Sequence, residues 1–123
     1  MTYKFYELEI WKIGYKLCME IYDITEIFPE EEKYALTTQI RKSANSVIAN
    51  IAEAHGRYYY ADKIRVLYIS RGELQETQSH LAVAYGRKYI DTQTFQNLSR
   101  SYEDLKVKIN NYITSINNKK QNG

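Results

Sequence analysis

The sequence predicts an all-α protein, a single up-down-up-down four-helix bundle over residues 1–123. One observation is the single proline in 123 residues, which leaves room for long uninterrupted helices. A second is that apolar residues recur at steps of three and four in four separate segments, the spacing of a helix with one face in a core. Four such helices with short connections fold most simply as an antiparallel bundle.

The first helix is expected over about residues 5–28, and it has two apolar stripes. One stripe is Leu8, Trp11, Tyr15, Cys18 and Tyr22, and the other is Ile10, Ile13, Leu17, Ile21 and Ile24. One stripe would fill a bundle core, and two make an apolar arc too wide for a helix that faces water. We therefore expect the surplus face, with Trp11, Tyr15 and Tyr22, to contact another subunit, although the spacing leaves open which stripe is core. Gly14 is a poor helix former, and it indicates close approach of another helix.

The second helix is expected over about residues 31–55, after the break at Pro29. Residues 30–32 are three glutamates, whose carboxylates suit the positive end of a helix dipole. The apolar stripe of this helix consists of Leu36, Ile40, Ala44, Val47, Ile51 and Ala54. Gly56 is expected as the C′ residue that ends the helix.

The third and fourth helices are expected over about residues 62–86 and 92–116. Asp62 is the expected N-cap of the third, and Asp91 or Thr92 that of the fourth. The seam of the third consists of Leu67, Arg71, Leu74, Gln78, Leu81 and Tyr85. The most regular stripe is that of the fourth, with Phe95, Leu98, Tyr102, Leu105, Ile109, Tyr112 and Ile116. We expect the polar residues after this stripe to fray.

An arginine on an apolar seam needs a partner, because its guanidinium stays charged and its unpaired burial is very unfavourable. Asn50 and Glu53 lie beside the stripe of the second helix, near the connection to the third. We therefore expect Asn50, Glu53 or both to meet Arg71 inside the bundle. The expected role of this pair is structural, and a catalytic role is the alternative.

The residue types argue against an enzyme and against a cofactor. Bundles that bind two metals use Glu-x-x-His pairs, and neither His55 nor His80 has a glutamate three residues before it. We expect no metal site, no cofactor and no catalytic residue. Cys18 is expected in the core, and one cysteine with no signal-peptide pattern favours a cytoplasmic protein. No apolar run is long enough to span a membrane, and we expect no small-molecule substrate.

Charge is unevenly distributed along the chain. Residues 1–32 carry eight acidic and three basic residues, a balance of −5, and residues 33–123 carry 14 basic and seven acidic residues, a balance of +7. The candidate nucleic-acid-binding residues are Arg41, Lys42, Arg57, Tyr58, Lys63, Arg65, Arg87 and Lys88. Bases beside stackable rings are typical of single-strand binding surfaces. The alternative is a solvated basic face with tyrosines packed at a subunit contact.

Two segments, FPEEEKYALTTQIRKSANSVIANIAEAHGR from residue 28 and YISRGELQETQSHL from residue 68, carry a family resemblance. They resemble the four-helix-bundle proteins encoded in intervening sequences of bacterial large-subunit ribosomal RNA. The resemblance runs from about Tyr6 to Ile116, and its most specific parts are FP at 28–29, QIR at 39–41, NIAE at 50–53 and RGEL at 71–74. One departure is AHGR at 54–57, where family members more often have a glycine directly after the glutamate. The accessory protein of diversity-generating retroelements is similar in fold.

The resemblance implies a small cytoplasmic bundle that assembles as a homopentamer. It implies RNA or DNA as a partner only loosely, since the family's molecular role is poorly defined. We therefore expect a non-enzymatic homo-oligomer that serves as a nucleic-acid or nucleoprotein accessory protein. The alternative is a protein–protein interaction scaffold with no nucleic-acid role.

Overall fold

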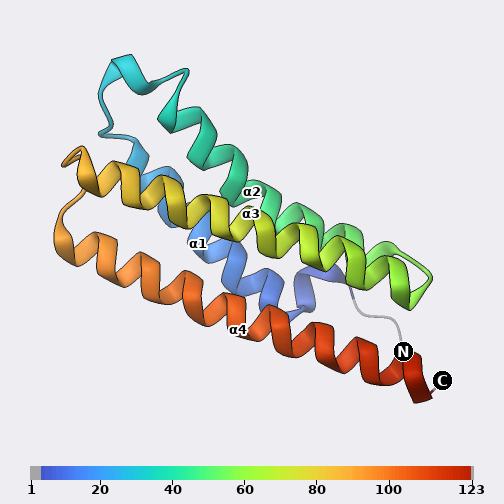
Figure 1. Ribbon diagram of the computed structural model, residues 1–123. Helices are drawn as coiled ribbons and strands as arrows, with labels where there is room; N and C mark the ends of the chain where they lie inside the picture. Colours follow the sequence, from blue (N-terminus) through green and yellow to red (C-terminus); the bar gives the residue numbers. More distant parts are fainter. Residues whose placement is uncertain (1–3, 123) are drawn as a thin grey trace.

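Four antiparallel helices pack into one elongated bundle (Figure 1). The structure is a computed structural model that describes residues 4–122. The helices are α1 (Glu9–Thr25), α2 (Leu36–Gly56), α3 (Tyr60–Gly86) and α4 (Thr92–Asn122), with short 3-10 turns η1 (Phe5–Glu7) and η2 (Glu30–Glu32). Each helix packs against the next along the chain, and α4 closes the bundle against α1 in the least extensive of these contacts. The predicted four-helix bundle is confirmed.

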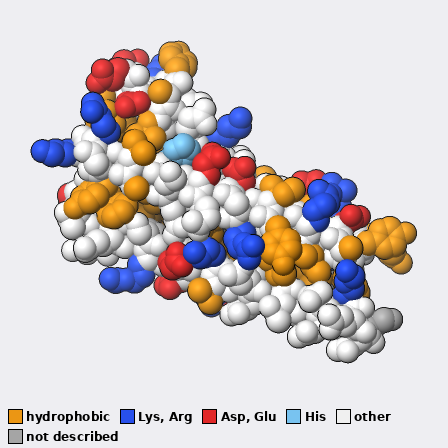
Figure 2. Space-filling view, viewed as in Figure 1, with side chains coloured by type: hydrophobic (Ala, Val, Ile, Leu, Met, Phe, Trp, Pro, Cys, Tyr) orange, Lys and Arg blue, Asp and Glu red, His pale blue; other side chains and the backbone are white. Residues whose placement is uncertain are grey.

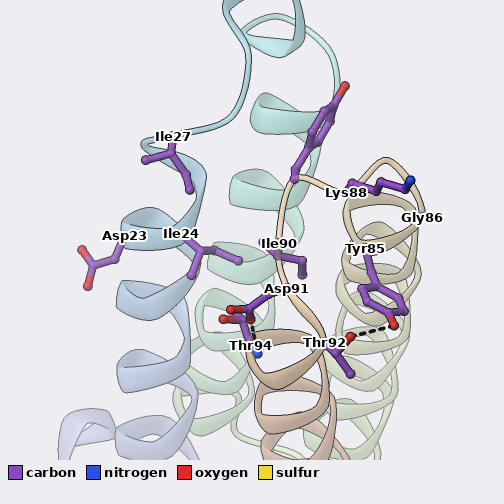
Figure 3. A pocket seen from close by; sticks show the side chains of 11 residues that line it. Asp23, Ile24, Ile27, Tyr85, Gly86, Lys88, Ile90, Asp91, Thr92 and Thr94 are labelled. Atoms are coloured by element: carbon purple, nitrogen blue, oxygen red, sulfur yellow. Dashed lines mark hydrogen bonds between the residues drawn. The ribbon is translucent and has the colours of Figure 1, made fainter.

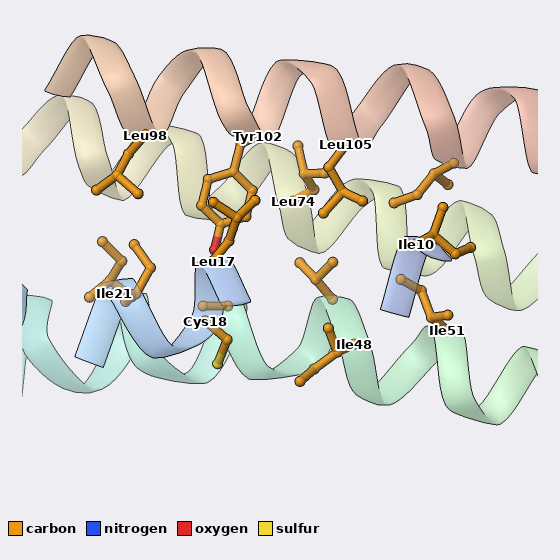
Figure 4. Close-up of a cluster of buried hydrophobic side chains, with 14 of the residues drawn as sticks. Ile10, Leu17, Cys18, Ile21, Ile48, Ile51, Leu74, Leu98, Tyr102 and Leu105 are labelled. Carbon is orange, nitrogen blue, oxygen red and sulfur yellow. The ribbon is translucent and has the colours of Figure 1, made fainter. Parts of the chain in front are cut away.

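The buried face of α1 is the second of its two apolar stripes. Ile10, Leu17 and Ile21 lie in the core, together with Cys18 from the first stripe (Figure 4). Tyr15 and Tyr22 lie on the outer side of α1 and are 45% and 39% exposed. The wide apolar arc seen in the sequence therefore leaves a row of large side chains outside the core of one subunit.

Gly14 lies on α1 in close contact with α2. A Cβ atom at this position would lie 2.6 Å from the Cγ2 methyl of Ile48, and 3.6 Å from a methyl of Leu105 on α4. Real Cβ atoms do not approach other atoms so closely, so only glycine fits between these side chains as they stand. The close approach predicted from Gly14 is confirmed.

The contact between α2 and α3 is the most extensive in the bundle, and it contains three buried hydroxyl groups. Thr77 donates to the hydroxyl of Ser43 over 2.8 Å, and Ser70 donates to the carbonyl of Val47 over 2.7 Å. Ser43 in turn donates to the carbonyl of Ile40. Small hydroxyl side chains let two helix backbones lie close together, and their hydrogen bonds satisfy the buried oxygens. The buried face of α3 is thus centred on Ser70 and Thr77.

Helix α1 is shorter than expected because an extended residue precedes it and tighter i→i+3 turns follow it. Leu8 is extended and separates η1 from α1, which begins at Glu9. At the other end the hydroxyl of Thr25 hydrogen-bonds the carbonyls of Ile21 and Tyr22, and Thr25 is the last helical residue. Such bonding by threonine competes with continuation of the helix.

The second and third helices begin at other residues than the sequence predicted. The glutamates at 30–32 form the separate turn η2, and α2 begins at Leu36, whose N–H donates to the carboxylate of Glu32. Helix α3 begins at Tyr60, with Tyr59 at the N-cap and no side-chain cap, so Asp62 is not the N-cap. Asp91 does cap α4, since its carboxylate accepts the N–H of Thr94 over 2.8 Å.

The residue that closes α3 in a left-handed conformation is a lysine. Lys88 has a φ of 65°, whereas no glycine among the described residues has a positive φ. The expectation that Gly56 ends α2 as a left-handed C′ residue is therefore wrong, and Gly56 is the last residue of the helix itself. After α3, the N–H of Lys88 donates to Tyr85 and that of Tyr89 to Ala84, which is the Schellman pattern with Lys88 at C′.

Lys88→Gly should stabilise the protein, because glycine adopts a positive φ without the steric strain of a Cβ atom. We expect the free energy of unfolding to rise by about 0.5–1 kcal/mol after the added freedom of the unfolded chain is subtracted. Chemical denaturation of the two proteins measures this difference. Arg87→Gly is the matched control, since Arg87 has a φ of −80°, and this change should lower stability.

Helix α4 extends beyond the range that its apolar stripe predicted. It continues to Asn122, and its last buried residue is Ile116. The polar residues expected to fray are helical up to Asn122. The final turns carry Lys119 and Lys120, both exposed, at the end of the bundle where α2 connects to α3 (Figure 1).

Candidate functional site

The eight predicted nucleic-acid-binding residues do not form one surface. Arg57, Tyr58, Lys63 and Arg65 lie where α2 connects to α3, and Arg87 and Lys88 lie where α3 connects to α4. Helix α3 has 27 residues, so the two groups lie about 40 Å apart along its axis. Arg41 and Lys42 lie in the first half of α2, towards the second group.

The first group surrounds three consecutive tyrosines, and we call residues 57–65 the tyrosine tip. Tyr58, Tyr59 and Tyr60 are exposed to 86%, 67% and 41%. Together with Lys63 they line an open hollow of about 470 Å³. Hydrophobic and basic side chains lie side by side at this end of the molecule (Figure 2). Exposed rings beside cations are the features that single-strand binding surfaces share.

Two of the cations at the tip already have protein partners. The ammonium of Lys63 donates to the main-chain carbonyls of Ala54 at 3.3 Å and His55 at 3.0 Å, which lie at the C-terminal end of α2. A cation is favourable there because free carbonyls carry partial negative charge. Partial burial lowers the pKa of Lys63. Arg57 pairs with Glu53 one turn earlier, and this pairing raises the pKa of Arg57.

The second group lies beside a hollow of about 750 Å³ between the end of α1 and the α3–α4 connection (Figure 3). Ile24 of α1 and Ile27 of the turn after it line this hollow, and Ile27 is 78% exposed. A smaller hollow of about 250 Å³ shares Asp23, Ile24 and Thr94 with it, so the two form one groove along α1 and α4. Carboxylates outnumber cations among the described residues that line the groove, which are Glu20, Asp23 and Asp91 against Lys88.

Arg41 has a structural role in holding α2 against the end of α1. Its Nε donates to the hydroxyl of Thr25 over 2.7 Å, and a second nitrogen donates to the carbonyl of Tyr22. The guanidinium also stacks over the Tyr22 ring, 4.8 Å from its centre. Lys42, the next residue, is exposed. These contacts use two of the five N–H donors of Arg41 and fix its guanidinium against the end of α1.

The predicted pairing of Arg71 with Asn50 or Glu53 is wrong. Arg71 donates to the side-chain oxygen of Asn110 on α4 over 2.7 Å, and its guanidinium lies over the ring of Tyr68. Asn50 bonds to the carbonyl of Ser46 within α2, and Glu53 pairs with Arg57. The physical reason is the rotation of α3: its buried face is centred on Ser70 and Thr77, so Arg71 points towards α4.

Sequence reasoning missed other cations at the end of the bundle that carries the tyrosine tip. Lys119 and Lys120 were expected in a frayed segment, but α4 holds them beyond the core at this end. The signal for them was available, because no proline or glycine interrupts the chain between Ile116 and Asn122. The opposite end carries η2 and its glutamates (Figure 2).

Among the described residues, the buried side chains form no cluster typical of a catalytic or metal site. Burial raises the pKa of the Cys18 thiol, so this group stays protonated at neutral pH. The hydroxyl of Tyr102 is also buried and has no hydrogen-bond partner, and burial raises the pKa of this hydroxyl. Across residues 4–122, no three His, Cys, Asp or Glu side chains gather as a metal site would require. Within the same range, no helix is long and apolar enough to cross a membrane.

Comparisons with known proteins agree on the fold and family. The family described as 23S rRNA-intervening sequence protein matches residues 6–111. A crystal structure of a protein of unknown function from the S23 ribosomal protein family of Bacteroides thetaiotaomicron superposes with a TM-score of 0.78. It is 22% identical, and the match covers 85% of this chain and 97% of that chain, which shows a shared fold. No curated protein matches. Because the family match covers most of the sequence, the chain belongs to the 23S rRNA-intervening sequence protein family.

Proposed function

We propose that this protein is a non-enzymatic, cytoplasmic homo-oligomer that binds nucleic acid weakly and with little sequence preference. The observation that carries the proposal is the tyrosine tip, where three exposed rings lie among Arg57, Lys63 and Arg65. The family's name links its members to ribosomal RNA, which makes RNA the first nucleic acid to test. A pentamer is the assembly that the family resemblance implies.

Assembly matters for affinity because one subunit has few charges to offer. The net charge of the chain is +2, and the tip alone has three bases against Glu53 and Asp62. Five copies around an axis would repeat the tip five times, and several weak contacts to one strand raise affinity without any new contact. The row of large side chains on the outer face of α1 provides an apolar surface for the subunit contact.

Nucleic-acid binding should show as a salt-dependent affinity for RNA. We expect the wild-type oligomer to shift a labelled RNA at about 50 mM salt and to lose it by about 200 mM, because each neutralised phosphate releases counterions. Arg57→Ala with Arg65→Ala should reduce the slope of log affinity against log salt by roughly 1–2 for each tip that contacts the strand. Lys63 stays in place in this variant, since it holds the end of α2.

The matched control removes two cations from the other end of the bundle, with Arg87→Ala and Lys88→Gly. Its salt slope should equal that of the wild type if the tip is the binding site. A reduced slope in the control and an unchanged slope in the tip variant would place the site at the α3–α4 connection instead. If neither RNA nor DNA is shifted by the wild type at about 50 mM salt, the nucleic-acid proposal fails.

The second candidate function is a protein-binding scaffold, and the groove between α1 and α4 favours it. This groove combines the exposed Ile27 with the carboxylates of Glu20 and Asp23. A protein partner with basic and apolar side chains would complement it. If the wild type binds neither RNA nor DNA, the protein-binding scaffold becomes the leading proposal.

A further inference from the structure

The three tyrosines of the tip differ in environment from Tyr102, which is buried in the core. Tyr58 and Tyr59 lie in or beside the connection, before the first turn of α3. A large ring left 86% or 67% exposed gains little from burial within one subunit. The fold therefore does not need these rings for its own core, and a ligand is free to use their faces.

The rings of Tyr58 and Tyr59 pack against each other edge to face. The centres of Tyr58 and Tyr59 lie 5.0 Å apart, and their planes make an angle of 84°. In this geometry the edge of one ring meets the face of the other, which leaves at least one broad face of the pair open. The hollow of about 470 Å³ beside them has a size common for small-ligand sites.

The charges around the hollow are too nearly balanced to bind a nucleic acid strongly on their own. Arg57, Lys63 and Arg65 are offset by Glu53 and Asp62, which leaves a local balance of +1. The ammonium of Lys63 uses two donors on α2 carbonyls, so one donor remains for a ligand. Stacking on the rings must therefore add to the salt-sensitive phosphate contacts for this tip to bind a nucleic acid.

We propose that the hollow of the tyrosine tip is a stacking site for an unpaired nucleobase, so that the protein binds single strands in preference to duplexes. This inference rests on the proposed function and specifies its ligand. In a duplex both faces of each base are covered by neighbouring bases, and only the base edges are accessible in the grooves. An unpaired base presents its whole face to Tyr58 or Tyr59, and stacking of this kind tolerates any base.

The test compares one labelled RNA as a single strand and as a duplex, by fluorescence anisotropy with the full-length protein at about 50 mM salt. The wild type should bind the single strand more tightly than the duplex. Tyr58→Ala with Tyr59→Ala should weaken single-strand binding by roughly 5- to 100-fold, the effect of losing one stacked base, and leave the weaker duplex binding unchanged. Tyr58→Phe with Tyr59→Phe is the matched control and should bind like the wild type, since phenylalanine keeps the stacking face.

Three results would overturn this inference and leave the proposed function standing. If the wild type binds RNA and the alanine pair binds it equally well, the stacking site is contradicted and the proposal of nucleic-acid binding stands. An equal loss of affinity for the single strand and the duplex would mean that the tyrosines contact both forms of the RNA alike. An alanine pair that dissociates the oligomer would assign the rings to a subunit contact. Absence of any wild-type binding would instead overturn the proposed function, and the inference with it.

Discussion

Replacing Tyr15 with glutamate is expected to dissociate the proposed oligomer into 14.6 kDa subunits that remain folded. Tyr15 lies on the outer face of α1, where its ring stacks on Trp11 with ring centres 5.1 Å apart. Phe5 packs edge-on against Trp11, so the three rings form one aromatic row. If a neighbouring subunit covers this row, the glutamate becomes a buried, unpaired carboxylate. Such a group typically destabilises by about 3–5 kcal/mol, which weakens each contact by roughly 100-fold or more.

Light scattering at micromolar concentration measures the change in mass, and circular dichroism shows that the helices remain. Tyr15→Phe should stay assembled, because it keeps the ring and the stacking. Tyr34→Glu is a second control, since Tyr34 is 86% exposed on the connection before α2 and lies outside the aromatic row. An unchanged mass for Tyr15→Glu would show that α1 does not use this face for the subunit contact.

Gly14→Ala is expected to lower the free energy of unfolding by about 1–3 kcal/mol, although alanine is intrinsically the better helix former. The added methyl would lie 2.6 Å from the Cγ2 of Ile48, and the methyls of a β-branched side chain have few alternative positions in a helix. Either α1 moves away from α2 or Ile48 leaves its preferred rotamer, and both changes disturb a packed core. Urea denaturation measures the effect directly.

A double-mutant cycle separates this steric clash from a general weakness at position 14. Ile48→Ala removes the methyl that meets the new Cβ atom, and alone it should cost about 2–5 kcal/mol through the lost core contacts. In that background Gly14→Ala should be neutral or stabilising, because it partly fills the space. A cost for Gly14→Ala that is the same in both backgrounds would contradict the clash.

The fold was predictable from the sequence because helix periodicity and short connections constrain it strongly. The stripe of α4 from Phe95 to Ile116 is buried as predicted, except that Phe95 and Tyr112 are partly exposed. Gly14 also carried information about packing, because a glycine weakens a helix interior and the close approach of α2 requires one there. Periodicity alone left open which stripe of α1 was core, because both stripes have the spacing of a helix face.

The partners of individual polar groups were less predictable, because they depend on the rotation of each helix about its axis. Apolar spacing placed Leu67, Leu74 and Leu81 in the core correctly. The same spacing gave no way to see that Ser70 and Thr77 would take the centre of the α3 face. Once they do, Arg71 turns towards α4 and meets Asn110 in place of Glu53.

The sequence also did not predict that the basic residues lie at two opposite ends of the bundle. Arg57 and Arg87 both follow glycines at helix ends, and they look equivalent in the sequence. The length of α3 places them at opposite ends. The tyrosine tip combines its cations with exposed rings, and for this reason we propose the binding site at this end of the bundle.

The most direct test of this account is sedimentation velocity of the wild-type protein with a fluorescently labelled single-stranded RNA at about 50 mM salt. One run reports both the mass of the assembly and whether the RNA travels with it. We expect the RNA signal to sediment with an oligomer several times heavier than the 14.6 kDa subunit, and to separate from it at about 200 mM salt. RNA that sediments alone, beside a protein of single-subunit mass, would contradict both the assembly and the nucleic-acid binding.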